Sequence, residues 1–303
     1  MPLAISAPAM IKRIIEISNP ARLSLKNQQM VIDRDGFESA TVPIEDIGIL
    51  ILDHPQISHS HGLLSACSEN NVAVIVCNGK HLPVAVLTPL EGNSLHTKTI
   101  ARQVQITEPT RKQLWKAIVQ AKVRAQAKAL DYAAADSHPL HTYASRVKSG
   151  DPDNIEAQAA RIYWHKLFGE EFRRNYESPG INVLLNYGYA VTRAAVARAI
   201  VATGLHPSLG LHHHNQYNSF CLADDLLEPL RPIVDIKVYE ISKNCQTSPE
   251  LTKETKRSLL EILSSACSID NRQLPFMVSL HYYASSIRKA ICGEEKRVEF
   301  PEI

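Results

Sequence analysis

The chain has 303 residues, 45% of them hydrophobic and 21% charged, and its formal net charge at pH 7 is +2. This composition is typical of a globular protein with a full hydrophobic core, and it excludes a disordered or low-complexity chain. No apolar run approaches the roughly 20 residues that span a bilayer, and no basic residue precedes the mildly apolar start, so we expect a cytoplasmic protein without membrane contact.

The first part of the chain, residues 10–85, is rich in short apolar runs. These runs of Val, Ile and Leu are separated by turn residues, for example at 19–20 and 78–79, a pattern typical of β-strands. One stretch, residues 60–71, favours a helix. We predict a small β-rich, sandwich-like domain with strands at residues 11–17, 28–34, 39–44, 47–53, 71–77 and 82–89.

The pattern changes after residue 85. We predict a linker at 86–95 and, from residue 96 to the end, long segments with helical periodicity. The predicted helices cover residues 95–105, 109–132, 154–176, 181–203, 222–241, 248–267 and 273–291, with a break between helices at 133–153. The sequence therefore predicts an α+β protein of two domains, the second of them larger and all-α.

Basic residues are concentrated at the start of the helical region. Residues 98–128 contain eight Lys or Arg and a single acidic residue, Glu108. A cluster this local suggests an anionic partner such as nucleic acid. A solvated basic helix face fits the pattern equally well, so the charge alone does not decide between them.

Several well-known catalytic motifs are missing from the sequence. There is no G-x-x-x-x-G-K-[ST] loop, no G-x-G-x-x-G, no H-E-x-x-H and no G-x-S-x-G. The six cysteines include no C-x-x-C pair, which disfavours a zinc knuckle or a redox motif. We therefore expect neither a nucleotide cofactor nor serine-hydrolase chemistry.

The stretch 210–229, GLHHHNQYNSFCLADDLLEP, contains three successive histidines followed by a predicted acidic helix. Glu228 falls on the same helical face as both Asp224 and Asp225, so spacing does not choose between the aspartates. Pro229 should distort or kink this helix. Taken alone, such a pattern is more often a hydrated loop followed by a solvated acidic face.

A second candidate is Glu156, in the stretch NIEAQAARIYWHKLF. It lies near a predicted helix start, where a carboxylate also interacts favourably with the helix dipole, and Tyr163 shares its face. A first-turn acid is the simpler interpretation. Imidazole and carboxylate ligands together, however, suit Mn²⁺ or Mg²⁺, ions that support phosphoryl transfer.

Over its whole length the sequence resembles the universal integrase of CRISPR adaptation, in its type II form. Lys122 and Gln126 occupy places expected from the family's pattern. Five segments carry the resemblance in the family's order and spacing: NPARLSLKNQQMVI, ARQVQITEPTRKQLWKAIVQAKVRAQA, NIEAQAARIYWHKLF, INVLLNYGYAVTRAAVARAI and GLHPSLGLHHHNQYNSFCLADDLLEPLRPIVD.

The resemblance implies a site for Mg²⁺ or Mn²⁺ formed by Glu156, His213 and Glu228, with Asp225 assisting catalysis. His213 is the histidine that matches the family's spacing, three residues after a glycine and fifteen before the second glutamate. The family's pattern gives no catalytic role to the neighbouring residues His212, His214 and Asp224.

The implied activity is spacer integration, in which a DNA 3′-hydroxyl attacks a phosphodiester of the CRISPR repeat without ATP. The implied partners are double-stranded DNA, a second copy bound through the β-rich domain, a small ferredoxin-like adaptation protein and the type II effector nuclease. A stand-alone metal-dependent structure-specific nuclease and an architectural DNA-binding subunit remain open alternatives. Candidate DNA contacts are Arg102, Lys122, Arg124, Arg161, Tyr163, Lys166 and Arg193.

Overall fold

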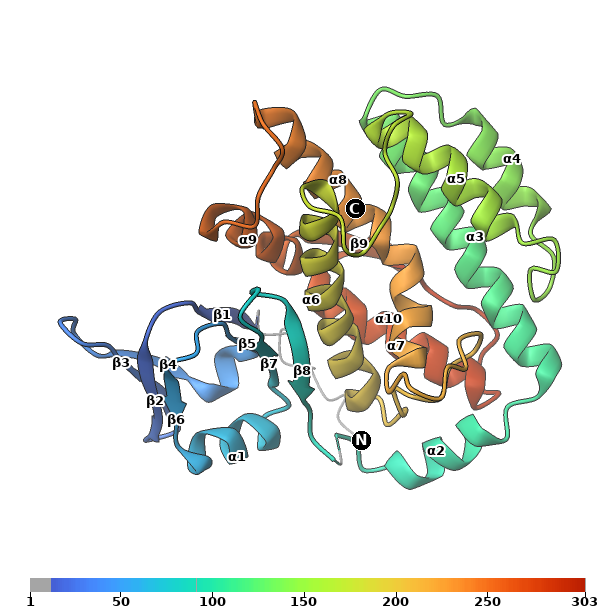
Figure 1. Cartoon of the computed structure of the whole chain (residues 1–303). Coiled ribbons are helices and arrows are strands. Elements are labelled where there is room, and N and C mark those ends of the chain that lie inside the picture. Colours follow the sequence, from blue (N-terminus) through green and yellow to red (C-terminus); the bar gives the residue numbers. More distant parts are fainter. Residues whose placement is uncertain (1–11, 91, 303) are drawn as a thin grey trace.

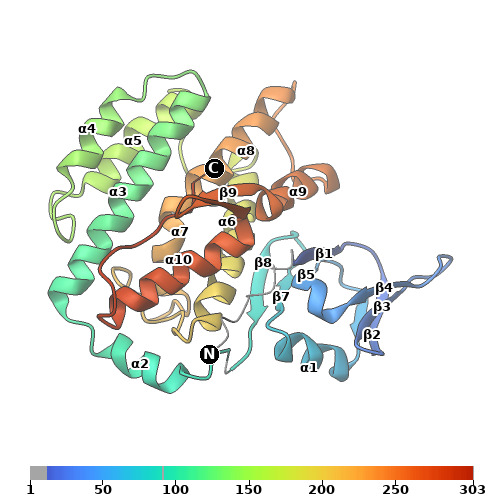
Figure 2. The same ribbon diagram turned by 180° about the vertical axis from the view of Figure 1, so that it is seen from behind.

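The computed structural model describes residues 12–90 and 92–302. A β-rich unit lies beside a larger, mostly helical unit, and the two views in Figures 1 and 2 show the same division. Strand β8 (Pro83–Leu87) is the last strand of the first unit, and α2 (His96–Val104) is the first helix of the second.

The β-rich unit contains two four-stranded sheets. In the first, with the order β1-β5-β7-β8, the first three strands are parallel and β8 is antiparallel; the second has the order β4-β3-β2-β6. A single helix, α1 (His61–Glu69), matches the predicted one. The other strands are β1 (Arg13–Ile17), β2 (Ala21–Lys26), β3 (Gln29–Asp33), β4 (Ala40–Pro43), β5 (Ile47–Leu52), β6 (Ile57–His59) and β7 (Ala73–Cys77).

Strand β5 explains why this region contains uninterrupted apolar runs, since all six of its residues are buried. Leu50 and Leu52 belong to a core shared with the second sheet and α1, whereas Ile49 and Ile51 belong to the core of the helical unit. Successive side chains point to opposite faces of a strand, so the first sheet separates two cores and is buried on both sides. The core shared by the two sheets confirms the sandwich-like β-rich domain.

The larger unit consists mainly of helices packed around the central α6 (Ile181–Ala202). This helix contacts α7, α8, α9 and α10 and is buried along most of its length, which explains its apolar sequence (Figure 1). No described helix is both long enough and apolar enough to cross a membrane. The remaining helices are α3 (Glu108–Tyr132), α4 (His138–Arg146), α5 (Ile155–Phe168), α7 (Cys221–Leu227), α8 (Arg231–Asn244), α9 (Lys253–Leu260) and α10 (Phe276–Ile291).

The prediction that this unit is all-α was wrong in one place. Strands β9 (Ala266–Ile269) and β10 (Arg272–Pro275) form an antiparallel hairpin at the end of one predicted helix and the start of the next. Asp270 and Asn271 form its turn, with φ of 48° and 58°. Two successive residues with positive φ are typical of tight hairpin turns, which Asp and Asn tolerate.

Two helices also differ from the prediction. Helix α4 lies within the predicted break, and it has a proline in its first turn, where the missing N–H costs nothing. Helix α5 ends at Phe168 rather than near residue 176, because Gly169 leaves the helical conformation with φ of 97°. The C-terminal segment runs beside β9 (Figure 2), and Glu302 forms an isolated β-bridge with Ser268 of that strand.

Candidate active site

Two carboxylates from distant parts of the chain meet at one ammonium group. Lys122 Nζ on α3 lies 2.5 Å from Glu156 Oε1 on α5 and 2.5 Å from Glu228 Oε2. The side chains of Lys122 and Glu228 are only 10% and 7% exposed. Buried charges are tolerated only when they are paired, so this is a point in the protein where a cation is strongly favoured.

Glu156 is positioned by the start of α5. The carboxylate of Asp151 accepts hydrogen bonds from the backbone N–H groups of Ile155, at 2.9 Å, and Glu156, at 3.0 Å. This side chain caps the helix from outside, whereas the adjacent Asn154 adopts φ of 50° and makes no cap bond. The cap fixes the backbone from which the Glu156 carboxylate projects toward α3.

Glu228 lies at a break between two helices. Helix α7 ends at Leu227, a 3-10 turn η2 (Glu228–Leu230) follows, and α8 begins at Arg231. Pro229 and Pro232 cannot donate helical hydrogen bonds, which accounts for the break and confirms the distortion predicted at Pro229. The break turns the Glu228 side chain toward α3 rather than along the α7 face.

The charge of Glu228 is fixed by two cations. Arg231 Nε donates to Glu228 Oε1 at 3.0 Å, and Lys122 contacts the other oxygen. Burial alone would raise the pKa of this carboxyl, but the guanidinium and ammonium groups outweigh burial and lower the pKa to about 2. Glu228 is therefore ionised at every pH at which the protein would act.

Arg231 rests on a buried aromatic and acidic layer. Its guanidinium lies 4.5 Å from the centre of the Tyr189 ring, and Tyr189 donates its hydroxyl hydrogen to Asp235. Tyr163 donates to the same carboxylate at 2.8 Å. Tyr163, one of the predicted DNA contacts, is fully buried in this structure and supports this layer.

The histidine loop is organised by Asp225, which is completely buried. Its Oδ2 accepts from the backbone N–H groups of Leu211, at 2.6 Å, and His212, at 3.0 Å, and its Oδ1 lies 2.6 Å from His213 Nδ1. A Cβ at Gly210 would lie 2.4 Å from the His213 carbonyl oxygen, so only glycine fits there. The bond to Asp225 is the main reason that the pKa of His213 is raised.

The three successive histidines have three different environments. The ring of His212 stacks on the buried Trp115, with centres 4.1 Å apart and planes 3° apart. His213 lines a pocket together with Glu228, while the exposed His214 lines a different pocket beside Arg111. The structure therefore places the three imidazoles in different surroundings, and of the three His213 alone lines the pocket of Glu228.

The pocket beside the paired carboxylates has a volume of about 370 Å³ and a basic wall. Arg193 contributes to this wall and lies 3.6 Å from Asp224. Asp224 therefore pairs with Arg193, and it also accepts a hydrogen bond from the loop residue Asn218. The pocket is lined by His213, Glu228, Arg174, Arg193, Arg231, Tyr176, Tyr189, Asn186, Asp224, Ala190, Leu227 and Pro83.

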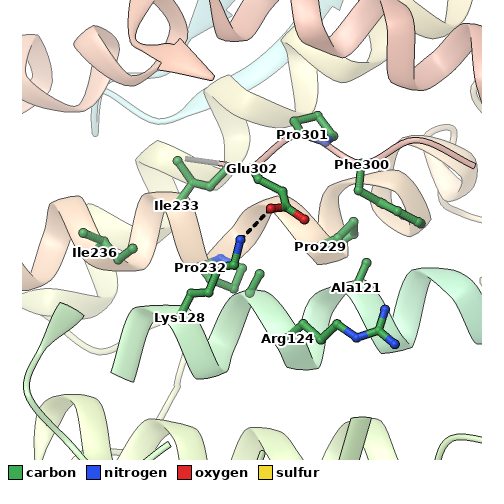
Figure 3. A pocket seen from close by; sticks show the side chains of 11 residues that line it. Ala121, Arg124, Lys128, Pro229, Pro232, Ile233, Ile236, Phe300, Pro301 and Glu302 are labelled. Carbon is green, nitrogen blue, oxygen red and sulfur yellow. Dashed lines mark hydrogen bonds and ion pairs between the residues drawn. The ribbon is translucent and has the colours of Figure 1, made fainter. Parts of the chain in front are cut away.

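The predicted DNA contacts have different locations. Lys122, one of the predicted DNA contacts, is buried between two carboxylates. Lys166 is half-buried and paired with Asp136 at 2.6 Å. Arg124 lies on the side of α3 that borders another pocket, next to the C-terminal segment (Figure 3). The exposed predicted contacts are Arg102, Arg124 and Arg161, and only Arg193 shares the pocket of His213.

Sequence reasoning missed several residues that hold the site together. Arg231 follows Glu228 by three positions, a spacing that can pair opposite charges on a helical turn, so this signal was present. Asp151 lies four and five residues before the N–H groups that it caps, so a local signal for it was also present. Trp115 gave no such signal, because its contact with His212 joins segments far apart in the chain.

The residues at this site fit a divalent cation. As they stand, no three His, Cys, Asp or Glu side chains within residues 12–90 and 92–302 are grouped so as to hold a metal ion. The donor set nevertheless suits one, because Glu156 and Glu228 converge on a single positive charge. Asp225 occupies Nδ1 of His213 and leaves Nε2 for a ligand, the usual arrangement of a metal-binding histidine.

Comparison with known proteins gives consistent matches. The family model described as CRISPR associated protein Cas1 matches residues 15–262. The CRISPR-associated endonuclease Cas1 of Neisseria meningitidis serogroup C (strain 8013) is 38% identical over 294 residues, covering 96% of this chain and 96% of that protein.

Two solved structures share the fold at lower sequence identity. A casposase bound to its integration product superposes with a TM-score of 0.77 and 18% identity over 94% of this chain and 91% of that chain. A Cas6-RT-Cas1–Cas2 complex gives a TM-score of 0.74 and 16% identity over 97% of this chain and 36% of that chain.

Proposed function

The chain belongs to the Cas1 family of CRISPR-associated endonucleases and integrases, and we propose that it joins spacer DNA 3′-hydroxyl ends to phosphodiesters of the CRISPR repeat. In this transesterification one phosphodiester replaces another, so no nucleotide cofactor is consumed. Endonuclease activity is the same displacement with water as the nucleophile, a hydrolase reaction. The observation that carries the proposal is the convergence of Glu156 and Glu228 on one point beside the His213 pocket.

Glu156, Glu228 and Nε2 of His213 would hold the divalent cation, Mg²⁺ or Mn²⁺. When bound, such an ion stabilises charge on the transferring phosphoryl group and makes an attacking hydroxyl more acidic. The protein's own groups prepare this site. Asp225 holds the His213 ring from its Nδ1 side, and Arg231 keeps Glu228 ionised and oriented.

DNA would reach the site along a basic surface. Arg193 is the predicted phosphate contact nearest the reacting groups, since it lies in the same pocket wall as His213. The exposed Arg102, Arg124 and Arg161 lie on three separate helices and would contact the backbone farther away. Contacts of this kind position DNA without selecting its sequence.

The working assembly would contain further chains. Residues 10–85 would form the contact between two copies. In each copy, residues 86–95 would link this β-rich domain to the catalytic domain at 96–303. The similarity to a casposase bound to integration product supports double-stranded DNA as substrate. The similarity to a Cas1–Cas2 complex supports a small ferredoxin-like adaptation partner, and a type II effector nuclease would be a further one.

A plasmid strand-transfer assay with 3′-hydroxyl and 3′-blocked oligonucleotides tests the proposal, with and without the partner protein. We expect covalent joining only with the free hydroxyl. Cleavage that ignores the 3′ end would instead identify a stand-alone structure-specific nuclease. DNA binding without any covalent product would identify an architectural subunit, and either result would overturn the integrase assignment.

A further inference from the structure

The place where a metal ion is expected already holds a positive charge. Lys122 Nζ touches one oxygen of Glu156 and one of Glu228, each at 2.5 Å. Mg²⁺ binds carboxylate oxygens at roughly 2.0–2.1 Å, so an ion held by these two oxygens and the ammonium cannot occupy the same point. We propose that Lys122 is a built-in counter-ion that competes with the divalent cation and leaves this point when the metal binds. This inference rests on the metal site of the proposed function.

Charge balance explains what such a residue would do. Without an added ion, Glu156 and Glu228 are matched by Lys122 and Arg231. A divalent ion added with both cations in place leaves an excess of two positive charges in a largely buried site, where like charges repel strongly. Metal binding to the DNA-free protein is therefore weak. DNA phosphates entering the pocket restore the balance, so metal and DNA bind cooperatively, each strengthening the other.

The structure also offers the displaced ammonium another acceptor. Gln126 lies four residues after Lys122, one turn along the same face of α3, and is 2% exposed. Its Oε1 is buried and has no hydrogen-bond partner among the described residues. A buried carbonyl oxygen without a hydrogen bond destabilises the folded protein. The flexible Lys122 side chain could move its ammonium group to Gln126 Oε1 and donate this missing hydrogen bond.

The direct test is to measure Mn²⁺ binding to the DNA-free protein. The electron paramagnetic resonance signal of free Mn²⁺ reports how much of the ion remains unbound. We expect Lys122→Met to bind Mn²⁺ at least about tenfold more tightly than the wild type, roughly 1.4 kcal/mol. Lys122→Arg retains the charge and should stay within about threefold of the wild type. The matched control is Lys128→Met, the same change on the same helix, where the exposed lysine pairs with Glu302 (Figure 3). Equal or weaker Mn²⁺ binding by Lys122→Met overturns the inference.

A measurement on the wild type covers the case in which Lys122→Met does not fold. The ¹⁵Nζ resonance of Lys122, identified by its absence in Lys122→Arg, should shift as Mg²⁺ is added until the site is saturated, while that of Lys128 stays in place. A Lys122 resonance unchanged in metal-saturated protein contradicts displacement.

Failure of the inference can be told apart from failure of the metal site itself. Glu156→Gln and Glu228→Gln should each abolish Mn²⁺ binding in the presence of DNA. If the wild type binds no Mn²⁺ even with DNA, the proposed metal site fails, and the inference with it. If the wild type binds Mn²⁺ and both Lys122 variants bind it with the wild-type affinity, only the inference about Lys122 fails.

Discussion

Replacing Asp225 by Asn tests whether this buried carboxylate sets the histidine loop. Asp225 accepts three backbone N–H bonds, from Leu211, His212 and His213, and also holds the His213 imidazole. Asparagine keeps the shape but replaces one accepting oxygen with an N–H₂ group that faces donors. Hydrogen bonds to a charged group contribute about 1.5–3 kcal/mol each, so losing one or two should destabilise the protein by about 2–4 kcal/mol. The released loop should lower strand transfer at least about tenfold.

The assay pairs urea unfolding with the strand-transfer rate at saturating DNA. Asp224→Asn is the matched control, because the neighbouring Asp224 lies on the same helix but contacts only Asn218 and, at 3.6 Å, Arg193 among the described residues. We expect the control to lose less than about 1 kcal/mol and to keep most of its activity. An Asp225→Asn protein as stable and active as Asp224→Asn would refute the positioning role.

The remaining predictions concern the loop, the surface and the buried layer. His212→Ala should lose about 1 kcal/mol through its stacking on Trp115 while retaining activity, and His214→Ala should change neither; a dead His214→Ala would place the ligand elsewhere. Replacing Arg102 and Arg124 by Ala should weaken DNA binding and lower the salt slope by about 1 per lost phosphate contact, and an unchanged slope would remove both from the interface. Burial raises the pKa of Asp235 to about 7 from its ordinary 3.8, despite hydrogen bonds from Tyr189 and Tyr163. The folded state therefore retains this proton, and stability is lost as pH rises from about 4 to 7, by roughly 4 kcal/mol at 1.36 kcal/mol per unit. As pH rises from about 4 to 7, Asp235→Asn should therefore gain stability relative to the wild type. A stability difference that stays constant over this range would contradict the raised pKa of Asp235.

Elements with strong periodicity were predictable from the sequence. The long helices and the buried strands follow their apolar patterns, and Pro229 signalled the helix break that orients Glu228. The β9–β10 hairpin was not predictable in the same way, because its four-residue strands are too short to show alternation and its Asp270–Asn271 turn lies among polar residues.

In the candidate site, too, local sequence patterns predicted some features and not others. Spacing alone left three histidines and two aspartates open, and only the resemblance selected His213 and Asp225. Lys122 was predicted as a phosphate contact because it belongs to the basic cluster at residues 98–128. Its burial depends on two carboxylates that lie 34 and 106 residues away, a distance over which local patterns carry no information.

In the proposed site, three ligands from separate segments hold one ion for strand transfer. Metal-dependent joining of a 3′-hydroxyl oligonucleotide can be measured for Glu156→Gln, His213→Ala and Glu228→Gln, with DNA affinity measured in parallel. We predict that each variant loses at least about three orders of magnitude in joining rate, as expected for loss of metal-assisted chemistry, while DNA affinity stays level or rises. A variant of any of the three that joins DNA at the wild-type rate would contradict the shared site.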